Sequence, residues 1–208
     1  MSDKELFDQE FQRLEDTEER YWTNWETATA EQITKEAVFC LMTPQSRATA
    51  AQKALDFAHN DYTKLTPDIL KASGVRFHIT KYARIQELLQ KNEYICSLLS
   101  QYPAPADNRS IRDTLAKTVN GWGLKEASHF MRNIRRGENL AIIDRHIISC
   151  MVARSLIPLS DYLNRFKLNY SRYTHYEEII VNYANSLGIP HPYLDMLWWA
   201  SKSGVYFK

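Results

Sequence analysis

The sequence predicts an all-α fold from three observations. Apolar residues recur at helical spacing along most of the chain, the alternation typical of strands is nearly absent, and prolines and glycines mark the breaks between segments. Hydrophobic residues make up 44% of the 208 residues, so a packed core is well supplied. We expect about ten short helices.

The individual helices follow from their start and stop residues. The first is expected over 3–25, with its aromatic and leucine side chains inward, and the second, around 33–41, ends at a Thr-Pro pair. Another Thr-Pro pair at 66–67 opens a short helix, and the prolines of 101–109 mark the longest loop. The clearest apolar stripe covers 176–187 and stops at a glycine, with a proline two residues further on.

The loop at 101–109 divides the helices unevenly. We expect one domain over 1–208, built from helical lobes of about 1–109 and 110–208 with a groove between them. The chain after this loop carries most of the distinctive residues, including a predicted helix–turn–helix at 111–136.

Composition excludes several classes of protein. No apolar run approaches the roughly 20 residues that a membrane-spanning helix needs, and the acidic start lacks a signal-peptide core. Cys40, Cys96 and Cys150 are scattered and odd in number, which indicates reduced thiols and a cytoplasmic protein. They are also too few for a structural zinc or a four-cysteine iron–sulfur cluster, so no metal is expected.

The net charge of +1 conceals an uneven distribution. Nine acids and three bases give the first 30 residues a charge of −6, so the remaining 178 residues carry +7. This surplus would suit a phosphate-binding face, although a solvated helix surface explains it equally well. The basic residues that gather in the second half are Lys125, Arg132, Arg135, Arg136, Arg145 and Arg154.

The segment LAKTVNGWGLKEASHFMRNI reads as a helix, a tight turn and a second helix. Gly121 and Gly123 permit a positive φ and a close backbone approach, and the helix that follows presents free N–H groups suited to a phosphate. These glycines are candidate DNA-backbone contacts, with an ordinary helix–helix turn as the alternative. A nucleotide P-loop is excluded, because Glu126 rather than Ser or Thr follows Lys125.

Asp144 follows Lys125 by nineteen residues, in AIIDRHI. Taken alone, Asp144 is an ordinary N-cap and His146 an ordinary structural histidine. The combination is more distinctive than its parts: a GxGxK hairpin, a helix, a turn containing Gly137, and then Asp-x-His.

This combination resembles the helix-hairpin-helix DNA glycosylase superfamily, and the wording GxGxKEASHFxRN followed by AIIDRHI is similar to the compact 8-oxoguanine DNA glycosylase/AP lyase type of archaea and some bacteria. CLMTPQSRA, GVRF and the tail W-x-x-x-x-G with its final lysine extend the resemblance over most of the chain. Many superfamily members have proline where this chain has Ile142, but the compact type resembles this chain there. The resemblance implies the helix-hairpin-helix DNA glycosylase fold, two helical lobes with a cleft between them.

The resemblance also implies an activity and two catalytic residues. A base-excision-repair enzyme of this type flips 8-oxoguanine out of duplex DNA, excises it through a Schiff base on Lys125, and cleaves the strand by β-elimination. Asp144 would stabilise the cationic sugar as a carboxylate. The alternative for Lys125 is a lysine that only contacts phosphate.

Other site residues come from positions in the resembling stretches. Aromatics are usually core residues, a polar turn residue is usually only that, and a chain end usually frays, so each has an ordinary alternative. Because Trp198 and Trp199 are adjacent on a helix, only one should face the base pocket. The implied roles are phosphate binding for Arg132 and His146, stacking walls from Phe77 and Trp199, gap filling by Gln45, and recognition of the N7–H of the base by the Lys208 carboxylate.

The expected partner is double-stranded DNA containing damaged guanine, bound by a monomer with no membrane contact. No cofactor is expected, although the hairpin carbonyls could hold a structural monovalent cation. Two alternatives remain: the same fold acting on oxidised pyrimidines or abasic sites, and a non-catalytic helix-hairpin-helix DNA-binding module. The absence of a C-terminal cysteine cluster weakens the oxidised-pyrimidine alternative.

Overall fold

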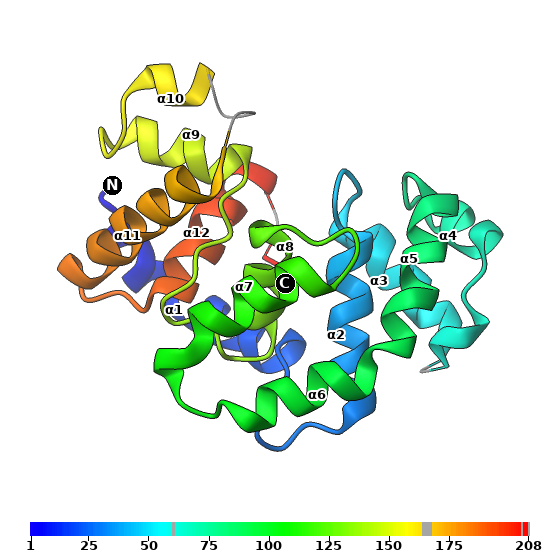
Figure 1. Ribbon diagram of the computed structural model, residues 1–208. Coiled ribbons are helices and arrows are strands. Elements are labelled where there is room, and N and C mark those ends of the chain that lie inside the picture. The colour runs from blue at the N-terminus through cyan, green and yellow to red at the C-terminus, as the bar shows by residue number, and fades with distance from the viewer. Residues whose placement is uncertain (60, 164–167, 205, 208) are drawn as a thin grey trace. The chain divides into compact units, whose positions relative to one another are not determined.

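The computed structural model describes residues 1–59, 61–163, 168–204 and 206–207, and these are helical without a strand, which confirms the all-α prediction (Figure 1). No helix among them is long and apolar enough to cross a membrane. The elements are α1 (Asp3–Tyr21), α2 (Ala30–Met42), α3 (Ala48–Ala58), η1 (Tyr62–Lys64), α4 (Pro67–Ser73), α5 (His78–Gln90), α6 (Asn92–Gln101), η2 (Pro105–Asp107), α7 (Asn108–Thr118), α8 (Leu124–Asn133), α9 (Arg145–Ala153), α10 (Leu159–Leu163), α11 (Tyr170–Ser186) and α12 (His191–Ser203).

The chain forms two compact units, which do not follow the expected lobes of 1–109 and 110–208. Unit 1 comprises Met1–Trp22 and Gly137–Lys208, and unit 2 comprises Thr23–Arg136. The loop after α6 is no boundary because buried Arg136 holds it inside unit 2: its guanidinium donates to the Leu99 carbonyl (3.1 Å) and the Tyr102 carbonyl (2.6 Å). The first helix joins unit 1 because α1 packs on α12.

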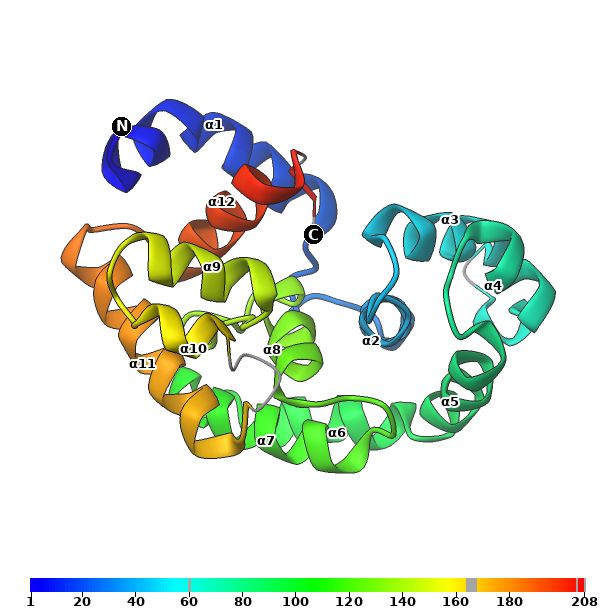
Figure 2. The same cartoon turned by 90° about the horizontal axis from the view of Figure 1, so that it is seen from above.

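Helix α2 is the centre of unit 2, and Figure 2 shows it nearly end-on. The last five residues of this helix, 38–42, are all apolar and buried. They cover every side of its C-terminal part, as expected of a helix that is surrounded by others. It packs against α3, α5, α6 and α8. A Thr29 capping box with Gln32 starts it, and Pro44 follows its end.

The α7–α8 hairpin is tied together and to α2 by buried polar side chains. Arg112 of α7 donates to the Ser128 hydroxyl of α8 at 3.0 Å. At the end of α8, the Asn133 amide donates to the Glu36 carboxylate of α2 at 3.1 Å. These contacts hold the hairpin as a rigid part of unit 2, because unpaired buried polar groups would be costly.

Unit 1 holds a buried segment, 140–143, that leads directly into α9. The Ala141 N–H donates to the Glu177 carboxylate (3.0 Å), and the Tyr173 hydroxyl donates to the Ala141 carbonyl (2.6 Å). Both partners lie on α11, so this helix holds the segment 140–143 in place. It thereby fixes the backbone position of Asp144, the residue that follows the segment.

The buried ion pair between Asp3 and Arg154 should be the main polar support of unit 1. Arg154 donates two hydrogen bonds to the Asp3 carboxylate, whose side chain is 5% exposed. Burial opposes ionisation, but the hydrogen bonds and charge of Arg154, with further hydrogen bonds from Tyr183 and Trp198, outweigh it and lower the pKa of Asp3 from 3.8. A lowered carboxyl pKa stabilises the fold above the unfolded value, and that stabilisation is lost as the pH falls through the folded pKa.

Arg154→Met should lower the free energy of unfolding by about 3–5 kcal/mol, because it leaves a buried carboxylate without its cation and with the Tyr183 hydroxyl (2.9 Å) as a remaining donor. Urea denaturation at pH 7 measures the change. Lys4→Met, which breaks the exposed Lys4–Asp8 pair of α1, is the matched control and should cost less than about 1 kcal/mol. Equal effects of the two substitutions would contradict the assigned role.

Candidate active site

The turn between α7 and α8 has the backbone that the glycines predict. Gly121 adopts a φ of +92°, which side-chain-bearing residues rarely take. Gly123 is the N-cap residue of α8, and its N–H donates to the Glu126 carboxylate at 3.1 Å. Buried Trp122 anchors the turn from between them. The helix-hairpin-helix at 111–136 is therefore confirmed, with α7 beginning slightly earlier.

Arg84 of α5 lies directly against this turn. A Cβ added to Gly121 would stand 2.6 Å from the Arg84 Cδ and 2.8 Å from its Nη1. Glycine at 121 thus leaves room for a guanidinium as well as permitting the positive φ. Sequence reasoning did not find Arg84, because nothing in its local pattern links it to a hairpin distant in the chain.

Lys125 lies in the first turn of α8, with its side chain 26% exposed and its Nζ 3.7 Å from the Glu126 Oε1. It belongs to a cationic cluster, which we define as Arg76, Lys81, Arg84 and Lys125. Burial first, and then the charges of Lys125, Arg76 and Arg84, lower the pKa of Lys81 to about 8. A cluster of this kind attracts an anionic ligand such as a DNA phosphate.

Asp144 is the N-cap residue of α9, as its position predicts. Its Oδ1 accepts hydrogen bonds from the backbone N–H groups of His146 (2.7 Å) and Ile147 (2.9 Å). The helix N-terminus therefore orients a carboxylate and stabilises its charge. The side chain is partly exposed, and no contact in the described part of the chain engages Oδ2.

His146 lies in the first turn of α9, and the Arg145 Nε is 3.3 Å from its Nε2. Both side chains are at least partly exposed, so they are accessible to a phosphate. Lys125 belongs to unit 2, whereas Asp144 and His146 belong to unit 1. The joint action of Lys125 and Asp144 therefore stays a prediction.

The residues predicted to contact the extruded base, and Gln45, predicted to fill the gap it leaves, have contrasting surroundings. Phe77 is 54% exposed and Gln45 lies on an exposed turn, both in unit 2. Trp198 is fully buried and Trp199 is partly exposed, which confirms that the two tryptophans face different ways. Lys208 lies outside the described residues, so the structure does not place its carboxylate.

Only some of the basic side chains in the second half of the chain are exposed. Arg132 is 5% exposed and donates to the Asn133 side-chain oxygen at 3.2 Å, while Arg136 is buried and stacks on Trp25. The phosphate contact predicted for Arg132 stays a prediction, and its burial makes it a weaker candidate than Arg84. A count of basic residues overestimates the charge available to DNA.

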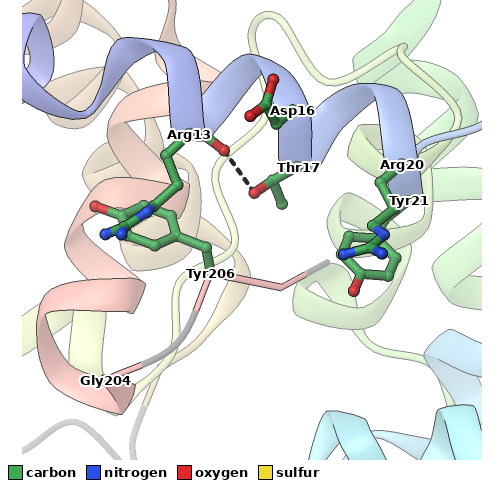
Figure 3. A pocket seen from close by; sticks show the side chains of 7 residues that line it. All are labelled: Arg13, Asp16, Thr17, Arg20, Tyr21, Gly204 and Tyr206. Carbon is green, nitrogen blue, oxygen red and sulfur yellow. Dashed lines mark hydrogen bonds between the residues drawn. The ribbon is translucent and has the colours of Figure 1, made fainter.

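The C-terminal segment packs on α1 within unit 1. The Arg13 guanidinium lies 5.3 Å from the centroid of the Tyr206 ring, and the rings of Phe207 and Tyr21 are 4.7 Å apart. Figure 3 shows Tyr206 beside Arg13, in a pocket lined by Arg13, Asp16, Thr17, Arg20, Tyr21, Gly204 and Tyr206. Helix α1 thus holds the residues that precede position 208.

The all-helical fold, the glycine hairpin and the lysine at its second helix define a helix-hairpin-helix DNA glycosylase. Residues 14–189 match the family model Ogg-HhH, 8-oxoguanine DNA glycosylase, and the chain belongs to this family.

Individual relatives agree with this assignment. The chain is 32% identical over 193 residues to an 8-oxoguanine DNA glycosylase/AP lyase from Fusobacterium nucleatum, covering 88% of this chain and 86% of that protein. A Thermoplasma acidophilum protein of the same name is 29% identical over 182 residues, covering 86% and 83%.

Solved structures share the fold. The 8-oxoguanine DNA glycosylase of Thermotoga maritima matches with a TM-score of 0.82 at 26% identity, over 99% of this chain and 98% of that one. The Methanocaldococcus jannaschii glycosylase/lyase in complex with 15mer DNA containing 8-oxoguanine matches with a TM-score of 0.80 at 20% identity, over 99% of both chains.

Proposed function

We propose that this protein is a bifunctional DNA repair enzyme that excises 8-oxoguanine from duplex DNA and cleaves the strand at the resulting abasic site. Membership of the 8-oxoguanine DNA glycosylase family supports the substrate. The observation that carries the reaction is Lys125, a partly exposed amine at the glycine hairpin of that family's fold.

The chemistry requires Lys125 to attack as a neutral amine. Its Nζ forms a bond to C1′ of the flipped nucleotide while the bond from C1′ to N9 breaks and the base leaves. Opening of the sugar ring gives a Schiff base between Nζ and C1′. Loss of a C2′ proton then expels the 3′ phosphate by β-elimination, which cuts the strand on the 3′ side.

Asp144 is suited to stabilise the positive charge that builds on the sugar as the base departs. Its Oδ1 is occupied by two N–H groups of α9, which leaves Oδ2 available. The same carboxylate can accept and return protons during base loss and elimination. An orientation set by a helix N-terminus needs little rearrangement during the reaction.

DNA is the proposed partner, and Arg76 and Arg84 of the cationic cluster, together with His146, are its proposed backbone contacts. A single damaged base has no symmetry, so a monomer is the proposed form. Chromosomal DNA in the cytoplasm is its proposed site of action. Phosphate contacts should make binding weaken steeply as salt rises. Gel filtration with and without duplex would test the monomer.

A monovalent cation at the hairpin is a separate proposal, supported by the chemistry of the turn. Backbone carbonyls would be its ligands, as suits a hard cation, and the Val119 carbonyl already accepts the Trp122 N–H at 3.1 Å. A carbonyl oxygen has a second lone pair that remains available. Melting temperatures in potassium and in a bulky organic cation would reveal such a site.

The Lys208 carboxylate is proposed to read the oxidised base, because an acceptor there would detect the N7–H that guanine lacks. The packing of Tyr206 and Phe207 on α1 supports a held tail. A short Gly-Ser extension after position 208 should reduce 8-oxoguanine excision at least about tenfold, equivalent to losing one hydrogen bond to a charged group. Cleavage of an abasic duplex, which needs no base recognition, is the control and should change little. Unchanged excision by the extended protein would refute this role.

A panel of three duplexes tests the proposed function. The protein is incubated with DNA containing 8-oxoguanine, thymine glycol or an abasic site, and strand cleavage is followed on denaturing gels. Cleavage at 8-oxoguanine and at the abasic site is expected. Cleavage at thymine glycol alone would indicate an oxidised-pyrimidine enzyme, cleavage of the abasic duplex alone a plain lyase, and binding without cleavage a DNA-binding module.

A further inference from the structure

Gln45 and Phe77 are among the exposed non-glycine residues of unit 2 that adopt a positive φ. Gln45 has a φ of +55° in the turn between α2 and α3, and Phe77 has a φ of +57° at the start of α5. Residues with a Cβ adopt this region rarely, at a cost of about 1–3 kcal/mol, and only where surrounding contacts impose it. Phe77 is predicted to stack on the extruded base, and Gln45 is predicted to fill the gap that the base leaves. We call residues 43–47 the wedge turn.

Lys81 of α5 supplies those contacts. Its side chain is buried, with the residue 4% exposed, and its ammonium donates to three oxygens around Gln45. They are the Met42 carbonyl (2.6 Å), the Pro44 carbonyl (2.7 Å) and the Ser46 hydroxyl (3.0 Å). The single ammonium of Lys81 therefore holds both ends of the wedge turn together from its buried side.

Ser46 extends the same network to Phe77. Its hydroxyl accepts the Arg76 backbone N–H at 2.9 Å, immediately before Phe77. The wedge turn and the Phe77 segment are thus joined by Lys81 and Ser46. Burying an ammonium near other cations is costly, as the lowered pKa of Lys81 indicates. Its three hydrogen bonds offset that cost and fix the backbone of the wedge turn.

The other end of α5 holds the hairpin. Lys91, directly after α5, donates to the Thr118 carbonyl at 2.8 Å, and the Asn120 amide donates to the Glu87 carboxylate at 3.0 Å. Between these ends Arg84 lies against Gly121. Helix α5 therefore connects the wedge turn to the hairpin that carries Lys125, and a helix of 13 residues spans about 20 Å.

We propose that Lys81 is a positioning residue for DNA opening: it presents Gln45 to the gap left by the flipped nucleotide, at a distance from the hairpin set by α5. The proposal rests on the proposed function and adds a residue that acts through Gln45, without touching the base. Its energetic role lies in the cost of unpairing, which is a few kcal/mol and falls when the lesion has no pairing partner.

Two substrates separate positioning from general damage. One duplex pairs 8-oxoguanine with cytosine, and the other places it opposite an abasic-site analogue, so that no base pair must be broken. Lys81→Met should lower single-turnover excision from the paired duplex about tenfold or more, and from the unpaired duplex less than about threefold. Gln45→Ala should show the same contrast.

A double-mutant cycle tests whether Lys81 acts through Gln45. The Gln45→Ala/Lys81→Met protein should be no slower on the paired duplex than the slower single variant, because both changes remove one device. Lys91→Met is the matched control at the opposite end of α5. Its effect should be similar on the two duplexes and should multiply with that of Gln45→Ala.

Ser46→Ala is the second, milder variant, and it carries the test if Lys81→Met does not fold. It should show the same preference for the unpaired duplex with a smaller loss. Equal losses on both duplexes, or multiplicative effects with Gln45→Ala, would overturn the role of Lys81. An unsubstituted protein that excises from neither duplex would instead refute the proposed function, so the two failures are distinct.

Discussion

Lys125→Gln will abolish covalent trapping to DNA and lower excision of 8-oxoguanine by about 10³-fold or more, as expected when the nucleophile of an enzyme is removed. Glutamine retains much of the length of lysine but has no amine that can form a Schiff base. Because Lys125 is on the surface of α8 with its side chain 26% exposed, the fold should be unaffected. Borohydride trapping and single-turnover excision measure the two losses.

Lys117→Gln is the matched control, since it makes the same chemical change on the exposed side of α7 in the same hairpin. It should alter activity only through a modest, salt-dependent loss of DNA affinity. Substantial excision by Lys125→Gln, or equal losses in the two variants, would assign Lys125 to phosphate binding alone. That outcome would favour the non-catalytic alternative for this lysine.

Asp144→Asn should lower excision roughly 10²–10³-fold, in the range seen when one electrostatic stabiliser of a transition state is removed. The asparagine oxygen can still accept the N–H groups of His146 and Ile147, so α9 keeps its cap. Only the charge is lost. DNA binding should remain, because the substitution removes a negative group rather than a cation.

Asp144→Ala separates the cap from the charge. It should lose the same activity and also about 1 kcal/mol of stability, because two N–H groups at the start of α9 lose their acceptor. If Asp144→Asn were fully active while Asp144→Ala was impaired, Asp144 would be a cap and nothing more. Comparing melting curves with excision rates for the two variants decides between these roles.

Much of the fold follows from local signals in the sequence. The helical period, the Thr-Pro pair that ends α2, the Thr-Pro pair that starts α4 and the glycine stop after 187 all predict helix limits that the structure contains. The first helix was predicted to end near residue 25, but it ends at Tyr21 because the backbone of Trp22 is extended. The lobe boundary was misplaced because a loop rich in proline resembles a linker, whereas the Arg136 contacts to Leu99 and Tyr102 are invisible in sequence.

The site divides in the same way. Gly121, Gly123 and the cap at Asp144 could be predicted because turn geometry and capping depend on neighbouring residues. Arg84 and Lys81 could not, because their importance arises from contacts with residues distant in the chain. The burial of Arg132 has the same origin: charge counts along a sequence do not reveal which side chains point inward.

The most direct test of the central claim is to locate the covalent bond. The protein is incubated with 8-oxoguanine duplex and borohydride, the adduct is digested, and the modified peptide is sequenced by mass spectrometry. We predict that the reduced sugar remnant is attached to Lys125. Attachment to Lys81, or to any amine other than the one on Lys125, would contradict the account.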